Sequence, residues 1–153
     1  MGSQKAWQTV AQEICDEMGS CLHYATPEQK ALAREYGCWW KFPAETRKDG
    51  FGFCYDLAAV ALQALIDEGC EEARLLFVRW GDWGFAANSG HFVCVFETEA
   101  GYHLIDNGVL KGPFPTFDCL LETAGRGHRV ECYRWFTFEQ IPFHTSYVSM
   151  RMF

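Results

Sequence analysis

The stretch GFGFCYDLAAVALQALIDEGC (50–70) sets one cysteine between a glycine-rich turn and a long apolar run. After Cys54, apolar residues recur at steps of three and four, which predicts a helix with this cysteine in its first turn. Alanines and a valine fill the positions between them, so we expect the helix to be buried nearly all round. The pattern runs to about Glu68, and Gly69 then supplies a C-cap. The sequence therefore predicts a buried central helix with a thiol at its N-terminus.

This placement makes Cys54 a candidate nucleophile. Unpaired backbone N–H groups and the positive end of the helix dipole both favour a thiolate over a thiol. The same N–H groups can stabilise the oxyanion that forms when the sulfur attacks a carbonyl. Asp56, in the same turn, is expected to interact with the dipole and to raise the pKa of the thiol somewhat. A core thiol without chemical role is the alternative for Cys54 alone.

Length and composition define the class of protein. The chain has 153 residues, of which 49% are hydrophobic and 22% charged, so we expect a single globular domain over residues 1–153. The net charge is −7 and no run of Lys or Arg exceeds two residues, which argues against nucleic-acid binding. No apolar stretch is long enough to span a bilayer, and the N-terminus lacks a signal-peptide core. We therefore expect a cytoplasmic protein without membrane association.

The cysteines allow two interpretations. Eight is an even number, so a secreted disulfide framework has to be considered. However, Cys15 lies in a helix-like segment and Cys94 in a strand-like one, where a thiol packs as a small hydrophobic group, so reduced thiols are favoured. No two cysteines have the short spacing of a structural zinc site, and the five histidines are well separated. We expect no metal and no cofactor.

The order of the segments predicts the fold class. Helical patterns cover residues 4–18 and the segment from Thr26 to about Glu35, and a loop-like stretch separates them from the central helix. Runs rich in β-branched and aromatic residues follow, separated by turn residues. They cover residues 73–80, 91–97, 102–106, 130–138 and 146–153. We therefore predict an α+β fold, with helices first and a mainly antiparallel sheet after them.

A candidate base and its partner lie on two consecutive strands. His91 begins one strand, and Asp106 ends the next strand after the turn 98–101. A two-residue loop would pair His91 with Asp106, and a four-residue loop would pair Asp106 with Val93. Either loop puts both side chains on one face of the sheet, whereas a three-residue loop without a bulge would separate them.

That face would also carry Val93, Val95 and Leu104, an apolar surface that the Cys54 helix could cover. A thiol, an imidazole and a carboxylate are the three parts of a cysteine nucleophile system. Each also has a simpler explanation. A strand histidine can be a satisfied polar residue, and a carboxylate before Asn107-Gly108 can begin a turn.

Three segments together resemble the core of the transglutaminase-like superfamily, a branch of the papain-like fold. They are residues 50–78, HFVCVFE (91–97) and GYHLIDNG (101–108). The motifs CYDLA and LIDN, with Trp40 and Pro43 ahead of the cysteine loop, look closest to the bacterial transglutaminase-like cysteine proteinases. The resemblance covers about residues 39–110. Phe53 stands where that family commonly has an acidic residue, so calcium dependence is not carried over.

The resemblance implies a papain-like core with Cys54, His91 and Asp106 as a catalytic triad. The expected function is a cysteine hydrolase, a protease or amidase that cleaves an amide, isopeptide or thioester bond of a peptide or protein through an acyl-enzyme. Acyl transfer to an amine, as in transglutaminases, is one alternative, and a catalytically silent binding module on the same fold is another.

Substrate contacts are expected from aromatic and polar residues near the triad. The glycine-rich loop 80–90 leads into His91 and could close over the site as a lid, so Trp83 and Asn88 are candidates. Trp40 is a further candidate, although indoles bury area readily and it could instead be wall or core.

Overall fold

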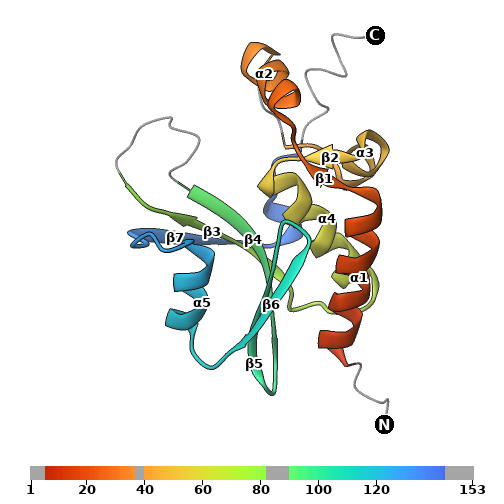
Figure 1. Ribbon diagram of the computed structural model, residues 1–153. Coiled ribbons are helices and arrows are strands. Elements are labelled where there is room, and N and C mark those ends of the chain that lie inside the picture. The colour runs from red at the N-terminus through yellow and green to blue at the C-terminus, as the bar shows by residue number, and fades with distance from the viewer. Residues whose placement is uncertain (1–5, 37–39, 82–89, 144–153) are drawn as a thin grey trace.

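The computed structural model describes residues 6–36, 40–81 and 90–143 (Figure 1). Its helices and strands follow one another with helices mainly in the first half of the chain and strands mainly in the second. In chain order they are α1 (Trp7–Cys21), β1 (His23–Tyr24), α2 (Pro27–Tyr36), α3 (Pro43–Asp49), β2 (Phe51–Gly52), α4 (Cys54–Asp67), β3 (Arg74–Arg79), β4 (Gly90–Thr98), β5 (Gly101–Asp106), β6 (Val109–Phe114), α5 (Phe117–Ala124), β7 (Cys132–Phe136) and a 3-10 turn (Phe138–Gln140).

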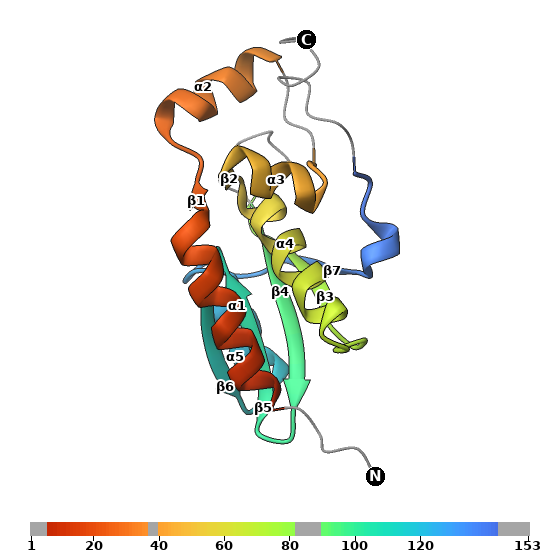
Figure 2. The same cartoon turned by 90° about the vertical axis from the view of Figure 1, so that its right-hand side faces the viewer.

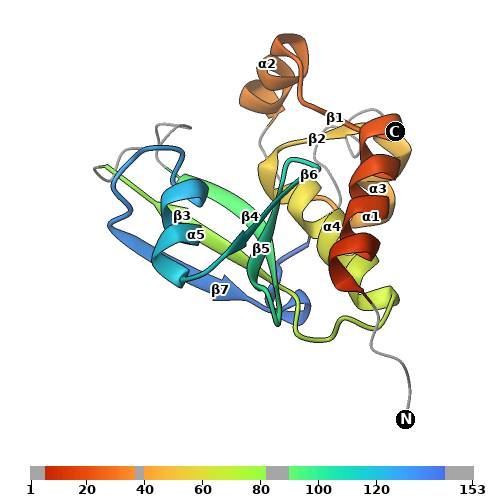
Figure 3. The same cartoon turned by 60° about the horizontal axis from the view of Figure 1, so that its bottom comes forward.

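The main sheet has five strands in the order β6-β5-β4-β3-β7, and every neighbouring pair is antiparallel. Helices α1 and α4 lie on one side of this sheet and α5 lies on the other (Figures 1, 2 and 3). A separate parallel pairing joins β1 to β2 just ahead of α4. The prediction of an α+β fold with a mainly antiparallel sheet is confirmed.

Helix α4 is the buried centre of the molecule. It begins at Cys54, ends at Asp67, and is followed by Gly69 at a φ of 103°. All residues from 56 to 62 are buried. They pack with α1 and with one face of β4 and β5 in a single apolar cluster that includes Ala11, Ile14, Met18, Cys94, Phe96 and Ile105. The predicted central helix is therefore confirmed.

The opposite face of the sheet is covered by α5 and not, as expected, by the Cys54 helix. Val93, Val95 and Leu104 pack there with Leu120 and Ala124 of α5. The sequence reading was wrong because it left out α5. The sequence does contain features typical of a helix here. Thr116 is a residue type that commonly caps helices, and in the structure its side chain accepts from the Cys119 N–H at 3.2 Å. The apolar residues of α5 also recur at helical spacing.

Two other helical predictions can be compared with the structure. Helix α2 begins as expected with a capping box, in which the Thr26 and Gln29 side chains each accept from the other's backbone N–H at 3.2 and 2.9 Å. Helix α3 lies within the stretch expected to be a loop, and this expectation is wrong because Pro43 occupies the first helical position, where proline is well tolerated. In the described segments, no helix is long and apolar enough to cross a membrane.

Strand β6 was also missed. Its sequence VLKGPF contains a glycine and a proline, which are typical of turns and not of strands. A proline cannot donate to a sheet ladder, and it is tolerated here because β6 is an edge strand. The strand predicted over residues 146–153 lies outside the described residues.

Candidate active site

The start of α4 is held by close packing of the preceding turn. Phe53 is the extended N-cap residue, and Cys54 is the first helical residue. A Cβ atom at Gly52 would lie 2.6 Å from the Cβ of Asp56 and 3.2 Å from the Cγ2 of Thr46. Only glycine therefore lets this turn approach the helix so closely, which explains the glycine two residues before the cysteine.

The buried side chain of Asp56 connects this turn to the helix by hydrogen bonds. One carboxylate oxygen accepts from the Lys41 N–H at 2.9 Å, and the other accepts from the Phe53 N–H at 3.0 Å. The side chain is buried, and burial raises its pKa to about 6. Asp56 thus does more than interact with the helix dipole, because it ties two backbone segments to the first turn of α4.

His91 and Asp106 are brought into direct contact. Cys94 pairs with Ile105 and Thr98 with Gly101, so Asp106 lies opposite Val93 and diagonal to His91. This is the second of the two registers considered from the sequence. The His91 Nε2 and the Asp106 Oδ1 are 2.7 Å apart, and both residues are only 3% exposed. The contact leaves Nδ1 as the ring nitrogen available to another group.

The Cys54 thiol lies beside the same strand. Strand β5 pairs with β4 only from Cys94 onward, so it does not occupy the N–H of Phe92. The thiol accepts from this N–H and from that of Tyr55. One of these two groups, the N–H of Phe92, directly follows His91 in strand β4. Cys54 is thereby placed beside the strand residue that follows His91.

Burial raises the pKa of the Cys54 thiol above its ordinary value. The hydrogen bonds from Phe92 and Tyr55 and the charge of Arg126 oppose this rise, and the charge of Asp56 adds to it as expected. The backbone N–H groups favour the thiolate as expected, but burial outweighs them. A thiolate at this position requires a base that takes the proton and remains close as a cation.

Two cations that sequence reasoning missed lie on Asp106. Arg126 Nη2 is 3.0 Å from Oδ1, the oxygen that His91 also contacts, and Lys111 Nζ is 3.4 Å from Oδ2. Burial alone would raise the pKa of Asp106, but the hydrogen bond from His91 and the charges of His91 and Arg126 hold it well below its usual range. Neither cation could be predicted from the sequence, because their places depend on α5 and β6.

The predicted substrate-binding residues are only partly described. Trp40 is half-buried, its indole N–H donates to the Tyr55 carbonyl at 2.9 Å, and its ring packs 4.9 Å from that of Phe92. Trp40 thus packs against the start of α4, and its indole N–H is already hydrogen-bonded within the protein. Trp83 and Asn88, with the rest of the expected lid, lie outside the described residues.

The remaining thiols differ from Cys54 in their surroundings. The seven described cysteines are all unbonded, and Cys15, Cys70 and Cys94 are buried in the core. Burial raises the pKa of Cys15 to about 11 and raises that of Cys94 as well. Cys21 and Cys132 are exposed at the surface. These two provide internal references for the reactivity of Cys54.

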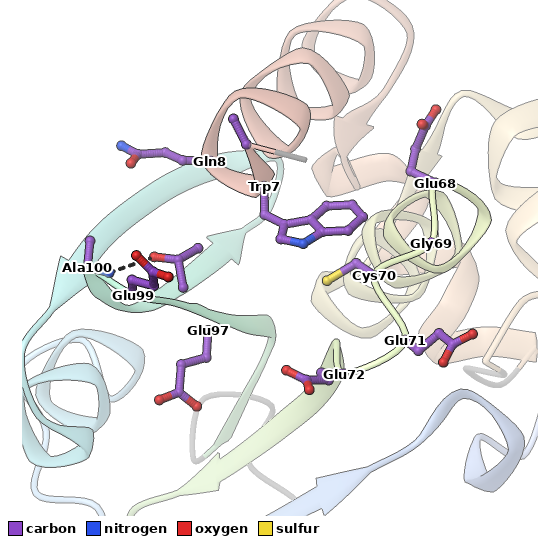
Figure 4. Close-up of a pocket in the computed structure, with 12 residues that line it drawn as sticks. Trp7, Gln8, Glu68, Gly69, Cys70, Glu71, Glu72, Glu97, Glu99 and Ala100 are labelled. Atoms are coloured by element: carbon purple, nitrogen blue, oxygen red, sulfur yellow. Dashed lines mark hydrogen bonds between the residues drawn. The ribbon is translucent and has the colours of Figure 1, made fainter. Parts of the chain in front are cut away.

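A groove of about 1090 Å³ lies at the other end of the sheet (Figure 4). It is lined by five glutamates together with Trp7 and Cys70. Strand β4 enters the candidate site at His91 and reaches this groove at Thr98, roughly 23 Å away at the usual rise per residue. The groove is therefore separate from the candidate site. Within the described segments, no three His, Cys, Asp or Glu side chains are arranged to hold a metal ion.

Comparisons with solved structures relate this arrangement to a known fold. The chain is similar to LapG of Legionella pneumophila, a transglutaminase-like cysteine protease, with a TM-score of 0.51 and 20% identity over 71% of this chain and 59% of LapG. The calcium-bound form of LapG gives a TM-score of 0.56 and 15% identity over 99% of this chain and 83% of LapG. In the first comparison the chain thus spans less than two thirds of its relative. No model of a protein family matches the chain, and no curated protein does. The similarity shows a shared fold and not a shared activity.

Proposed function

We propose that the protein is a cysteine hydrolase that cleaves an amide, isopeptide or thioester bond of a peptide or protein through an acyl-enzyme. Cys54 is the nucleophile, His91 is the base, and Asp106 orients His91. The observation that carries this proposal is the buried 2.7 Å contact between His91 Nε2 and Asp106 Oδ1, one residue from the N–H that binds the thiol. The fold shared with LapG supports it.

In the first half-reaction, His91 Nδ1 takes the thiol proton and the Cys54 sulfur attacks the carbonyl carbon. The C–N, or C–S, bond to the leaving group then breaks, and the imidazolium returns its proton to that group. In the second half-reaction, His91 removes a proton from water, which attacks the thioester and releases the acid and the thiol. Backbone N–H groups at the start of α4 are positioned to stabilise the oxyanion in both steps.

Alkylation by iodoacetamide at near-neutral pH, resolved for each cysteine by mass spectrometry, tests the proposal. We expect Cys54 to react ahead of Cys21 and Cys132 although it is less exposed, because only an ion pair with His91 would make it a thiolate. His91→Ala should abolish this preference and leave the two reference thiols unchanged. If the exposed cysteines react first in the wild-type protein, Cys54 is not an activated nucleophile.

One observation favours a second candidate, a catalytically silent binding module on the same fold. Burial raises the pKa of Cys54, and its thiol binds backbone N–H groups instead of the His91 ring. A silent module predicts slow labelling of Cys54 with or without His91. Acyl transfer remains the alternative within the enzyme class, and it is distinguished by adding a primary amine to a reaction with p-nitrophenyl acetate. Because amines also attack this ester without enzyme, only acylated amine formed beyond the amount seen with Cys54→Ala would identify a transferase.

A further inference from the structure

Arg126 lies in a position that the three candidate triad residues do not explain. Its Nη2 contacts the same Asp106 oxygen that receives His91, at 3.0 Å and 2.7 Å respectively. Its positive charge also acts on the Cys54 thiol. One guanidinium group thus interacts with both ends of the candidate triad, while it remains 48% exposed.

The turn that carries Arg126 is well held. It follows α5, and its backbone is fixed by bonds from Gly125 N–H to the Leu121 carbonyl at 2.8 Å and from His128 N–H to the Gly125 carbonyl at 2.9 Å. The His128 ring stacks on Trp80 with centroids 4.6 Å apart and an interplanar angle of 2°. These contacts fix the backbone of the turn from which the Arg126 side chain reaches Asp106.

The backbone at Arg126 adds a further indication. Its φ of 53° is in the left-handed region, and in the described residues the other non-glycine residue with positive φ is Asn107, which follows Asp106. Such conformations cost free energy in residues with a side chain, and they concentrate at functional sites. Asn107 follows Asp106 in the chain, and Arg126 contacts the Asp106 carboxylate through its side chain.

We propose that Arg126 is a positioning residue of the candidate triad, which fixes the Asp106 carboxylate against His91 and supplies positive charge near Cys54. The proposal rests on the proposed function. Without Arg126, the carboxylate would keep His91 and the longer contact to Lys111 at 3.4 Å, so it could rotate away from the ring nitrogen. The ring would then present Nδ1 to the thiol less often, and the thiolate would lose a nearby cation.

The test measures the rate of Cys54 alkylation by iodoacetamide against pH. The charged groups that act on the thiol are Asp56 on α4 and Arg126 itself. Those that contact Asp106 on β5 are His91 on β4, Lys111 on β6 and again Arg126. We expect Arg126→Gln to move the midpoint upward by about half a pH unit or more, since the lost charge is partly screened by solvent. The rate at pH 7 should fall about tenfold. Arg126→Lys should restore most of the midpoint, because it keeps the charge, and only part of the rate.

Arg129→Gln is the matched control, because it removes the same charge from an exposed residue three positions away. An equal effect of this control would mean that net charge alone is responsible and would overturn the proposal. Asp106→Asn supplies a second control. If Arg126 acts through Asp106, Arg126→Gln should change the rate much less in the Asp106→Asn background than in the wild type.

The outcomes separate the two proposals. If wild-type Cys54 shows no selective reactivity, the proposed function fails first. If wild-type Cys54 is selectively reactive, and folded Arg126→Gln has the same pH midpoint and rate of Cys54 alkylation as the wild type, the role of Arg126 is contradicted and the proposed function stands. Should Arg126→Gln not fold, Arg126→Lys decides in its place, since an unchanged rate in that variant would also contradict a requirement for the guanidinium fork.

Discussion

At the scale of single residues, the proposed activation of Cys54 would have to come from a partner, because its buried position raises the pKa of the thiol. Burial opposes the thiolate, and the surrounding N–H groups and Arg126 offset this only in part. The thiol accepts from the Phe92 N–H, and His91 is the residue directly before Phe92 in strand β4. Catalysis would therefore require the Nδ1 of His91 to approach the sulfur.

Cys54→Ser should retain the fold and lose nucleophilic reactivity. The thiol accepts from backbone N–H groups, and a serine hydroxyl can accept in the same way. We expect the free energy of unfolding to change by less than about 1 kcal/mol in urea titrations. A large loss of stability would indicate a structural cysteine instead.

Substitutions of Asp106 should reduce the rate of acyl-enzyme formation in the order wild type, then Asn, then Ala. An asparagine oxygen can still accept from the His91 ring, whereas alanine leaves the ring, Arg126 and Lys111 without this partner. Stopped-flow release of p-nitrophenol from p-nitrophenyl acetate measures this rate. If both variants are as fast as the wild type, Asp106 is only a strand-end residue.

At the scale of elements, the start of α4 depends on contacts that no helical pattern predicts. Cys54, His91 and Asp106 were found from a helix start, a strand start and a strand end, and the even hairpin loop placed the last two on one face. The face covered by α4 could not be predicted, because that required knowing that α5 occupies the other face. For the same reason, Arg126 and Lys111 could not be linked to Asp106 from the sequence.

Asp56→Ala should destabilise the protein by about 2 kcal/mol, because it leaves two backbone N–H groups without their acceptor. It should also slow the alkylation of Cys54, since the turn before α4 is no longer fixed to the helix. Asp67→Ala, at the exposed end of the same helix, is the control and should leave both quantities nearly unchanged. Urea unfolding gives the first and mass spectrometry gives the second.

His128→Ala should act in the same direction as Arg126→Gln but more weakly. It removes the stack on Trp80 and leaves the guanidinium in place on a looser turn. We expect a loss of two- to fivefold in the rate of Cys54 alkylation, on the order of 0.5–1 kcal/mol of positioning. A greater loss than that of Arg126→Gln would show that the turn acts by another route.

At the scale of the whole molecule, two buried carboxylates should give stability opposite dependences on pH. The folded pKa of Asp56 is raised to about 6, so the part of its contribution that depends on the bound proton is fully present below the unfolded pKa and is lost as the pH rises through about 6. The folded pKa of Asp106 is lowered, so its contribution is present above the unfolded value and is lost as the pH falls well below it.

Urea unfolding at pH 5 and pH 7 tests this expectation. The free energy of unfolding of the wild type relative to Asp56→Asn should be greater at pH 5, by about 1–2 kcal/mol. Asp106→Asn should flatten the loss of stability below about pH 4. An equal wild-type advantage over Asp56→Asn at both pH values would mean that Asp56 is not perturbed.

Trapping the acyl-enzyme shows whether Cys54 forms this intermediate and whether His91 is needed for it. The protein is mixed with p-nitrophenyl acetate, quenched in acid within the first turnover and digested, and the acetyl group is then located by mass spectrometry. The mechanism predicts acetyl on Cys54 in the wild type and little or none on Cys54 in His91→Ala. Acetylation of Cys54 to the same extent in both proteins, or only at other residues, would contradict it.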